Sequence, residues 1–288
     1  MGNQEKGFVF AHDWRDAFLV IISLLELSGK VALVIFWDAL QLPFPLLCMA
    51  ALCLLNCSNY QCAAHYFVHL PFFSRQSLNR LWGIVGSMGL GVPMVFYGAH
   101  HLNHHRFGSD YIDRDIGDTH DRSSIYRHGR APNEPEDLWR YALFGPFRES
   151  LVLAVADVRC RGETVQFVAE LASIGLLLLA LSICNLRGLV LIYLPIWYLG
   201  LVLAYAENYL EHFGARPGDR RTDAVSCYGR LYNLVWFNNG YHQEHHFRPG
   251  THWSRLPELR NQMLPESKRR VVSIAHFMNC KLRTAPTR

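Results

Sequence analysis

The chain has 288 residues, of which 50% are hydrophobic and 18% charged, and its net charge is +4. An apolar, aromatic-rich chain of this kind is neither disordered nor collagen-like. The small net charge, without a basic stripe interleaved with aromatic residues, argues against nucleic-acid binding. The most unusual count is that of histidine, with 15 residues, most of them in tight clusters.

Two apolar segments in the first quarter of the chain predict membrane-spanning helices. The segment at about 18–36 contains Glu26 and Lys30, which at positions i and i+4 can pair on one helix face. The segment at about 43–67 begins with prolines, which suit a helix start, and becomes polar toward its end. With a rise of about 1.5 Å per residue, both can cross a hydrocarbon core about 30 Å thick.

The rest of the chain predicts one more pair of spans. Residues 72–96 are apolar but rich in glycine, which favours an interfacial or re-entrant helix. Spans at about 167–184 and 188–206 are separated by a short turn. Residues 70–165 contain eleven arginines, whereas the two hairpin turns contain only Arg187. By the positive-inside rule, both termini and this middle segment are cytoplasmic.

Together these segments predict an all-α integral membrane protein. We expect about four transmembrane helices in two hairpins, with a cytoplasmic histidine-rich cap formed by residues 70–165 and 207–288. Residues 1–288 would then form a single multi-pass domain. It would lie in the inner membrane of a bacterium or in the endoplasmic reticulum of a eukaryote, with its metal site on the cytoplasmic side.

Four histidine clusters lie at or beyond the ends of the predicted spans: HYFVH at 65–69, HLNHH at 101–105, ENYLEH at 207–212 and HQEHH at 242–246. On a helix, positions i, i+3 and i+4 share a face, so the imidazoles of each cluster can reach one metal ion. The clusters contain nine histidines, and a catalytic zinc needs only three protein ligands. The count therefore favours two ions, each bound by four or five imidazoles.

The motifs HYFVH, HLNHH and HQEHH resemble the three histidine boxes of membrane fatty acid desaturases and related hydroxylases. Their order along the chain matches, with two boxes before the second helical hairpin and one after it. The segment ENYLEHFG at 207–214 is similar to a motif of the membrane alkane monooxygenases, and its Asn-x-x-x-His also resembles an element of acyl-CoA desaturases. The resemblance covers roughly residues 17–260.

The resemblance implies a di-iron centre bound entirely by histidine. Asn208 is implied to bind the cofactor indirectly, by holding a metal-bound water. His100 also fits a looser form of the second box, so the spacing leaves open whether it replaces or joins His101. The helical face shared with His104 and His105 favours His101. The implied iron ligands are His65, His69, His101, His104, His105, His212, His242, His245 and His246.

The implied reaction is dioxygen-dependent oxidation of an aliphatic C–H bond in a lipid-like, fatty acyl substrate. Loss of a second hydrogen gives an alkene, and return of hydroxyl gives an alcohol. The compact length favours desaturation, whereas the segment at 207–214 favours hydroxylation. A carotenoid substrate fits the same family. A membrane zinc hydrolase needs fewer histidines, and a metal transporter would place them near mid-membrane.

The sequence also indicates what must come from outside. It contains no CxxC pair, no haem motif and no flavin or nicotinamide fingerprint. We therefore expect a separate electron donor, a ferredoxin, rubredoxin or cytochrome, on the basic cytoplasmic face. Metal-bound imidazoles usually donate their second N–H to a carboxylate or carbonyl. The carboxylates near the boxes that could accept it are Glu211, Glu244, Asp110, Asp113 and Asp115.

Overall fold

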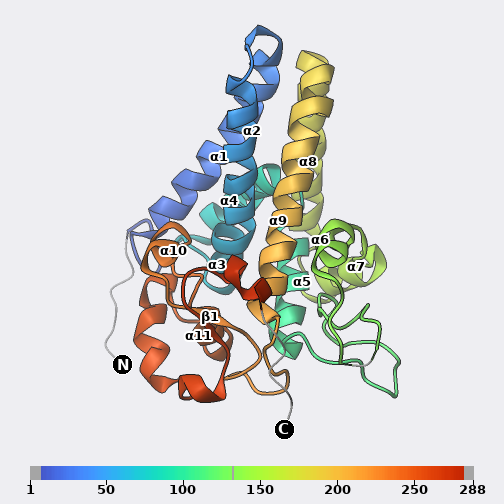
Figure 1. Ribbon diagram of the computed structural model, residues 1–288. Coiled ribbons are helices and arrows are strands. Elements are labelled where there is room, and N and C mark those ends of the chain that lie inside the picture. The colour runs from blue at the N-terminus through green and yellow to red at the C-terminus, as the bar shows by residue number, and fades with distance from the viewer. Residues whose placement is uncertain (1–7, 132, 282–288) are drawn as a thin grey trace. The chain divides into compact units, whose positions relative to one another are not determined.

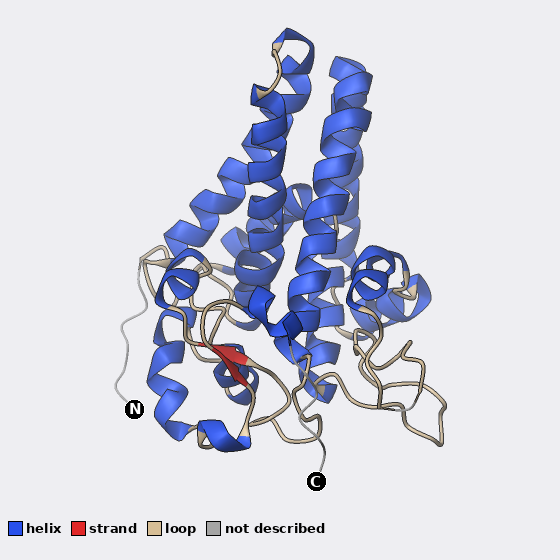
Figure 2. Ribbon diagram, in the orientation of Figure 1, coloured by secondary structure: helices blue, strands red, loops and turns tan. Residues whose placement is uncertain are grey.

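The computed structural model describes residues 8–131 and 133–281, which are mostly helical (Figures 1 and 2). The chain divides into two compact units, each built from two separate stretches. Unit 1 comprises Met1–Ala99 and Ser150–Ala204, and unit 2 comprises His100–Glu149 and Tyr205–Arg288. Residues 132 and 282–288 of the predicted cap lie outside the described residues.

Unit 1 begins with two long helical runs that pack against each other (Figure 1). The first is α1 (Asp16–Phe36), followed by the 3-10 turn η1 (Trp37–Ala39). The second consists of α2 (Phe44–Ser58), the π-helical segment η2 (Asn59–Ala64) and α3 (His65–His69). The predicted segments at 18–36 and 43–67 coincide with these runs.

The glycine-rich segment forms a helix that ends in a sharp bend. Helices α4 (Gln76–Leu90) and α5 (Met94–Phe107) meet at an angle of 87°. Gly91, at the end of α4, has a positive φ of 70°. A Cβ at this position would also lie 2.7 Å from the Trp197 ring, so both the backbone and the space require glycine.

The last part of unit 1 is the helical run Thr164–His212, preceded by α7 (Leu151–Cys160). The run comprises α8 (Thr164–Gly188), the π-helical segment η4 (Leu189–Tyr193) and α9 (Leu194–His212), whose end belongs to unit 2. Asn185 has a non-helical backbone and interrupts the run, and η4 packs against α8. The break lies where the sequence predicted a turn between two spans.

By length and composition, the described residues contain three helical runs that could cross a membrane, or four if the bent α4–α5 pair counts as one span. The sequence predicted about four spans. The two counts divide the chain differently. The structure has one helical run at Thr164–His212, where the sequence predicted two spans.

Unit 2 consists of short elements joined by long loops, together with the ends of α5 and α9. Figure 2 shows a small sheet in the described part of this unit, in which two strands pair in parallel. A small apolar cluster around Ile125, Tyr141 and Tyr209 packs the loop after α5 against α6 and α9. The elements of the unit are α6 (Leu138–Phe144), η3 (Gly145–Phe147), β1 (Ser226–Cys227), α10 (Arg230–Val235), α11 (His242–Phe247), η5 (Trp253–Gln262), η6 (Glu266–Lys268), β2 (Val271–Val272) and η7 (His276–Lys281).

Candidate metal centre

Three helices carry the clustered histidines of unit 2. On α5, residues 101, 104 and 105 stand at i, i+3 and i+4, and on α11 residues 242, 245 and 246 repeat that spacing. His212 is the last residue of α9. Imidazoles are polar, yet these are buried, with at most 7% of any residue exposed: His101, His104, His105, His212, His242, His245 and His246.

One group of four imidazoles lies entirely within unit 2. His104, His212, His242 and His246 each offer a ring nitrogen, and these four atoms lie within 4.8 Å of one another. The Nε2 atoms of His212 and His242 are 3.3 Å apart. Two nitrogens bound to one ion at about 2.1 Å are separated by about 3.0–3.4 Å. The group therefore has the spacing of a set of metal ligands.

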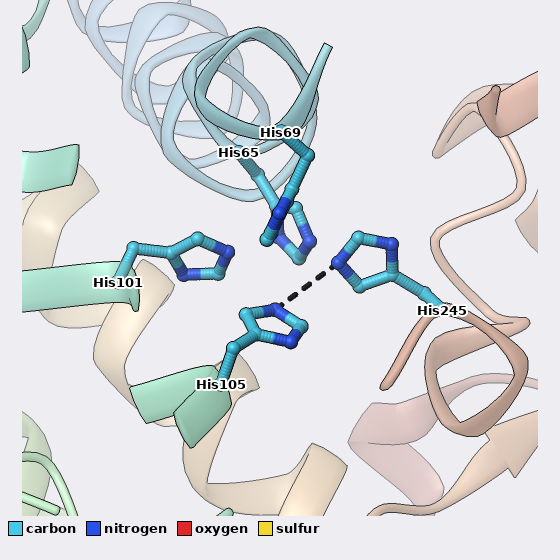
Figure 3. Close-up of side chains that lie close together, drawn as sticks. All are labelled: His65, His69, His101, His105 and His245. Atoms are coloured by element: carbon cyan, nitrogen blue, oxygen red, sulfur yellow. Dashed lines mark hydrogen bonds between the residues drawn. The ribbon is translucent and has the colours of Figure 1, made fainter. Parts of the chain in front are cut away.

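A second group in unit 2 consists of His101, His105 and His245 (Figure 3). The Nε2 atoms of His105 and His245 are 3.1 Å apart, as the dashed line in Figure 3 marks. The rings of His101 and His105 meet edge to face, with centroids 4.5 Å apart. The three clustered histidines on α5, like the three on α11, are thus divided between the two groups.

His65 and His69 belong to unit 1, where they begin and end α3. Their ring centroids are 5.7 Å apart, so the i and i+4 positions share a face as predicted. The π-helical segment η2 directly precedes them, and π-helical turns are frequent at functional sites because they change the direction of the following side chains. Figure 3 draws both residues together with the second group of unit 2.

His100 is not part of either histidine group. Its Nδ1 lies 2.9 Å from Glu149 Oε2 instead. Among the described residues, His101 and not His100 shares a group with His105.

The imidazoles are held by acceptors that the sequence motifs did not single out. Asp121 Oδ2 is 2.7 Å from His104 Nδ1, and the Nδ1–H of His212 donates to the Asp223 carbonyl at 2.8 Å. Such bonds hold the proton on Nδ1, so the Nε2 lone pair is available to a metal. Asp121 follows the second box by 16 residues, and Asp223 follows His212 by 11 residues. Both lie in irregular loops, where periodicity carries no signal.

The electrostatics of these carboxylates differ. Burial raises the pKa of Asp121, but His104 and the hydrogen bonds from Ser123 outweigh burial and hold the pKa well below its usual range. Burial raises the pKa of Asp223 to about 6, although His212 and His104 act in the opposite direction. Asp223 Oδ2 also lies 3.5 Å from His246 Nδ1. Asp121 therefore provides a fixed negative charge beside His104.

Only one of the five predicted carboxylates lies beside a clustered histidine. Glu211 Oε2 is 3.6 Å from His242 Nε2. Glu244 instead accepts from Ser226 and Tyr228. Asp110 binds His120 and the backbone of the following loop, and the exposed turn that contains residues 113 and 115 contacts none of the clustered histidines.

A further buried group in unit 2, Glu207, Glu211 and His276, has donor atoms close enough for a metal. Its members are already held by protein groups. Glu207 accepts from Trp236 Nε1 at 2.8 Å, Glu211 accepts from Asn239 at 2.7 Å, and His276 Nε2 donates to the Val225 carbonyl at 3.0 Å. Burial lowers the pKa of His276 to about 4, which keeps the ring neutral. The group is therefore better described as a hydrogen-bonded network that supports the neighbouring histidines than as a metal site.

Asn208 lies one helical turn before His212 on α9. Its Nδ2 donates to Tyr141 Oη at 2.9 Å, and Tyr141 in turn donates to the Ser123 carbonyl. Ser123 Oγ is 3.2 Å from His104 Nδ1. A hydrogen-bonded chain thus connects the predicted cofactor-binding residue with one of the histidines.

The donor set fits a transition metal. Imidazole nitrogen suits iron, zinc, copper and nickel, whereas calcium and magnesium require oxygen ligands. Within the described residues, the buried Nε2 of His104 has no hydrogen-bond partner. Leaving a buried polar atom unpaired costs about 1–3 kcal/mol, which an ion bound at this position would offset.

Comparisons with known proteins place these histidine clusters within a known enzyme family. The fatty acid desaturase family model matches residues 39–277. A sphingolipid delta(4)-desaturase of Drosophila melanogaster is 29% identical, over 88% of this chain and 75% of its own length. One from Oryza sativa is 30% identical, over 72% of this chain and 60% of its own length. A Caenorhabditis elegans protein, whose name pairs sphingolipid delta(4)-desaturase with C4-monooxygenase, is 30% identical over 65% of this chain and 49% of its own length. No solved structure matches significantly.

The match spans most of the chain and contains all four histidine clusters. Members of this family are oxidoreductases that act on lipids, and the buried imidazole groups are consistent with that chemistry. The chain belongs to the fatty acid desaturase family and is an oxidoreductase.

Proposed function

We propose that this enzyme holds two iron ions bound only by histidine. One ion is bound by His104, His212, His242 and His246. The other is bound by His101, His105 and His245 of unit 2. His65 and His69 of unit 1 are the remaining proposed ligands. The observation that carries the proposal is the division of the unit 2 imidazoles into two groups with metal-ligand spacing.

The protein groups around the ions would fix their geometry. When bound, the two irons supply the dioxygen chemistry that breaks an aliphatic C–H bond. Asp121 and the Asp223 carbonyl hold the Nδ1 protons of His104 and His212, which keeps each Nε2 available as a ligand. Burial of the histidines excludes water, which protects reactive species from side reactions. Asn208 would hold a metal-bound water through its amide.

The substrate we propose is a lipid with a long aliphatic chain, of the sphingolipid type named for the relatives. We favour desaturation, because the Drosophila and Oryza relatives are both named desaturases. Hydroxylation is the second candidate, since the name of the Caenorhabditis elegans relative pairs the two reactions. Both reactions begin with removal of one hydrogen, and the position of the carbon radical relative to the metal centre decides between them.

We further propose that the spans form two hairpins, with both termini and the metal centre on the cytoplasmic side. A separate electron donor, a ferredoxin, rubredoxin or cytochrome, would dock on the arginine-rich face. A charge-steered encounter slows as salt rises. The apparent Michaelis constant for the donor should therefore rise with ionic strength, and a constant value would contradict docking by charge.

The proposal is tested by metal analysis of the detergent-purified protein beside its His245→Ala variant. We expect close to two irons per chain by mass spectrometry, and a lower content in the variant. One zinc and no iron would overturn the di-iron proposal and favour a hydrolase. Incubation with N-acylsphinganine, dioxygen and a reducing system then distinguishes the reactions, because the product either loses two hydrogens or gains one oxygen.

A further inference from the structure

Unit 2 contains a polar recess that the proposed reaction does not use. It is a small hollow, part of it open to solvent. The recess is adjacent to a proposed metal ligand, because Ser123 lines the recess and also contacts His104. Its lining is formed by His100, Arg122, Ser123, Ser124, Arg127, His128, Tyr141, Gly145, Arg148, Glu149 and Tyr205.

The recess explains where the extra histidine of the second box goes. His100 faces Glu149 at 2.9 Å, and Glu149 also lies 3.3 Å from Arg122 Nε. The side chains of Arg122 and Glu149 are only 9% exposed. A buried guanidinium on a loop is costly unless it is held by partners. This part of the recess is therefore a built polar site and not an incidental surface gap.

The charges in the recess favour an anion. Three guanidinium groups and one carboxylate line it. Arg148 makes a two-pronged ion pair with Glu136, and Arg127 makes one with Asp118. Neither of these carboxylates lines the recess. A guanidinium has five N–H donors, so each pair fixes the arginine in place and leaves donors for a second anion.

One side of the recess is formed by a segment suited to a membrane surface. Helix α6 and η3 lead directly to Arg148 and Glu149. They expose Trp139 at 59%, Phe144 at 56% and Phe147 at 67%. Exposed aromatic residues next to basic ones are typical of the bilayer interface, where lipid headgroups lie. A charged ligand beside these residues would therefore be part of a lipid.

We propose that this recess binds the phosphate group of an anionic membrane lipid. Arg122, Arg127 and Arg148 donate to the phosphate oxygens, and the aromatic residues of α6 and η3 contact the acyl region. The site requires no metal, so it is independent of the proposed iron chemistry. It would hold a lipid next to the metal centre through the loop that also contains Ser123.

The chain offers a matched pair of variants to test this site. Arg148 and Arg140 both form an ion pair with Glu136, but only Arg148 lines the recess. Either single change to glutamine leaves Glu136 with one arginine partner. The full chain in detergent is titrated with phosphatidic acid or phosphatidylcholine of the same acyl chains, and bound lipid is counted by native mass spectrometry. Inorganic phosphate serves as a competitor.

We expect the unaltered protein to bind phosphatidic acid at least about tenfold more tightly than phosphatidylcholine. Hydrogen bonds to a charged group contribute more to the binding free energy than those between neutral groups. Arg148→Gln should abolish that preference and Arg140→Gln should retain it. If Arg148→Gln fails to fold, as judged by its melting temperature, Arg127→Gln takes its place. Equal losses in the Arg148 and Arg140 variants, or no preference in the unaltered protein, would overturn the site. Inorganic phosphate binding as tightly as the lipid would overturn the lipid assignment.

Discussion

Unit 1 and unit 2 both bury polar side chains, but they satisfy them in opposite ways. In α1, Lys30 Nζ lies 2.6 Å from Glu26 Oε1, with neither side chain exposed. Asn56 donates to the same carboxylate at 3.0 Å, and Lys30 also donates to the Gly89 carbonyl. Each of these donors meets an acceptor within unit 1, and in this sense the network is closed.

The histidine groups of unit 2 are not closed in this way. Ring nitrogens meet ring nitrogens, at 3.3 Å between His212 and His242 and at 3.1 Å between His105 and His245. Both members of each pair use Nε2, and a pair of neutral imidazoles can share at most one proton there. Polar groups that complement one another stabilise a fold, whereas imidazole nitrogens that face one another at this distance are suited to binding a cation.

The largest expected effect comes from removing one ligand. His104→Ala should lower turnover more than about a hundredfold, which exceeds the usual loss for a residue behind a ligand. The protein should still insert in the membrane, because the packing of unit 1 does not involve this residue. Turnover and iron per chain are measured together. His120→Ala is the control, since this exposed histidine binds Asp110 and belongs to neither group. A His104 variant with full activity would remove His104 from the ligand set.

Breaking the closed network should instead affect stability. Lys30→Met leaves the Glu26 carboxylate buried without its cation, which typically costs about 3–5 kcal/mol. Thermal unfolding in detergent should show the loss, while the folded fraction keeps its iron. The double variant Lys30→Met with Glu26→Leu should recover most of the stability, because no buried charge is left unpaired. A double variant as unstable as the single one would show that packing, and not the charge pair, determines the effect.

The smallest effect is expected from changing a residue that holds a proposed metal ligand in place but does not bind the metal itself. Asp121→Asn weakens the hold on the His104 Nδ1 proton, and such changes usually lower metal affinity about 10–100-fold. A chelator titration measures this loss, and the melting temperature of the metal-free protein should change little. Asp118→Asn is matched to it, because Asp118 lies in the same loop but pairs with Arg127. Equal loss of affinity in both variants would assign the effect to the loop as a whole.

Much of the fold could be predicted from local patterns. The predicted runs at 18–36 and 43–67 match the observed helical runs Asp16–Ala39 and Phe44–His69 to within a few residues, because apolar length and proline at a helix start act locally. The Glu26–Lys30 pair followed from i and i+4 spacing. The shared faces of the histidines on α3, α5 and α11 followed from the same helical period.

Apolar helices and clustered imidazoles could be derived from local sequence patterns, since helix length and the 3.6-residue period depend only on neighbours along the chain. How the imidazoles of unit 2 divide into groups, with His104 apart from His101 and His105, depends on the tertiary fold. The fold also places His100 opposite Glu149, and Asp121 and Asp223 beside His104 and His212. These contacts join residues 11 to 49 positions apart, where no local period operates and packing alone selects the partner.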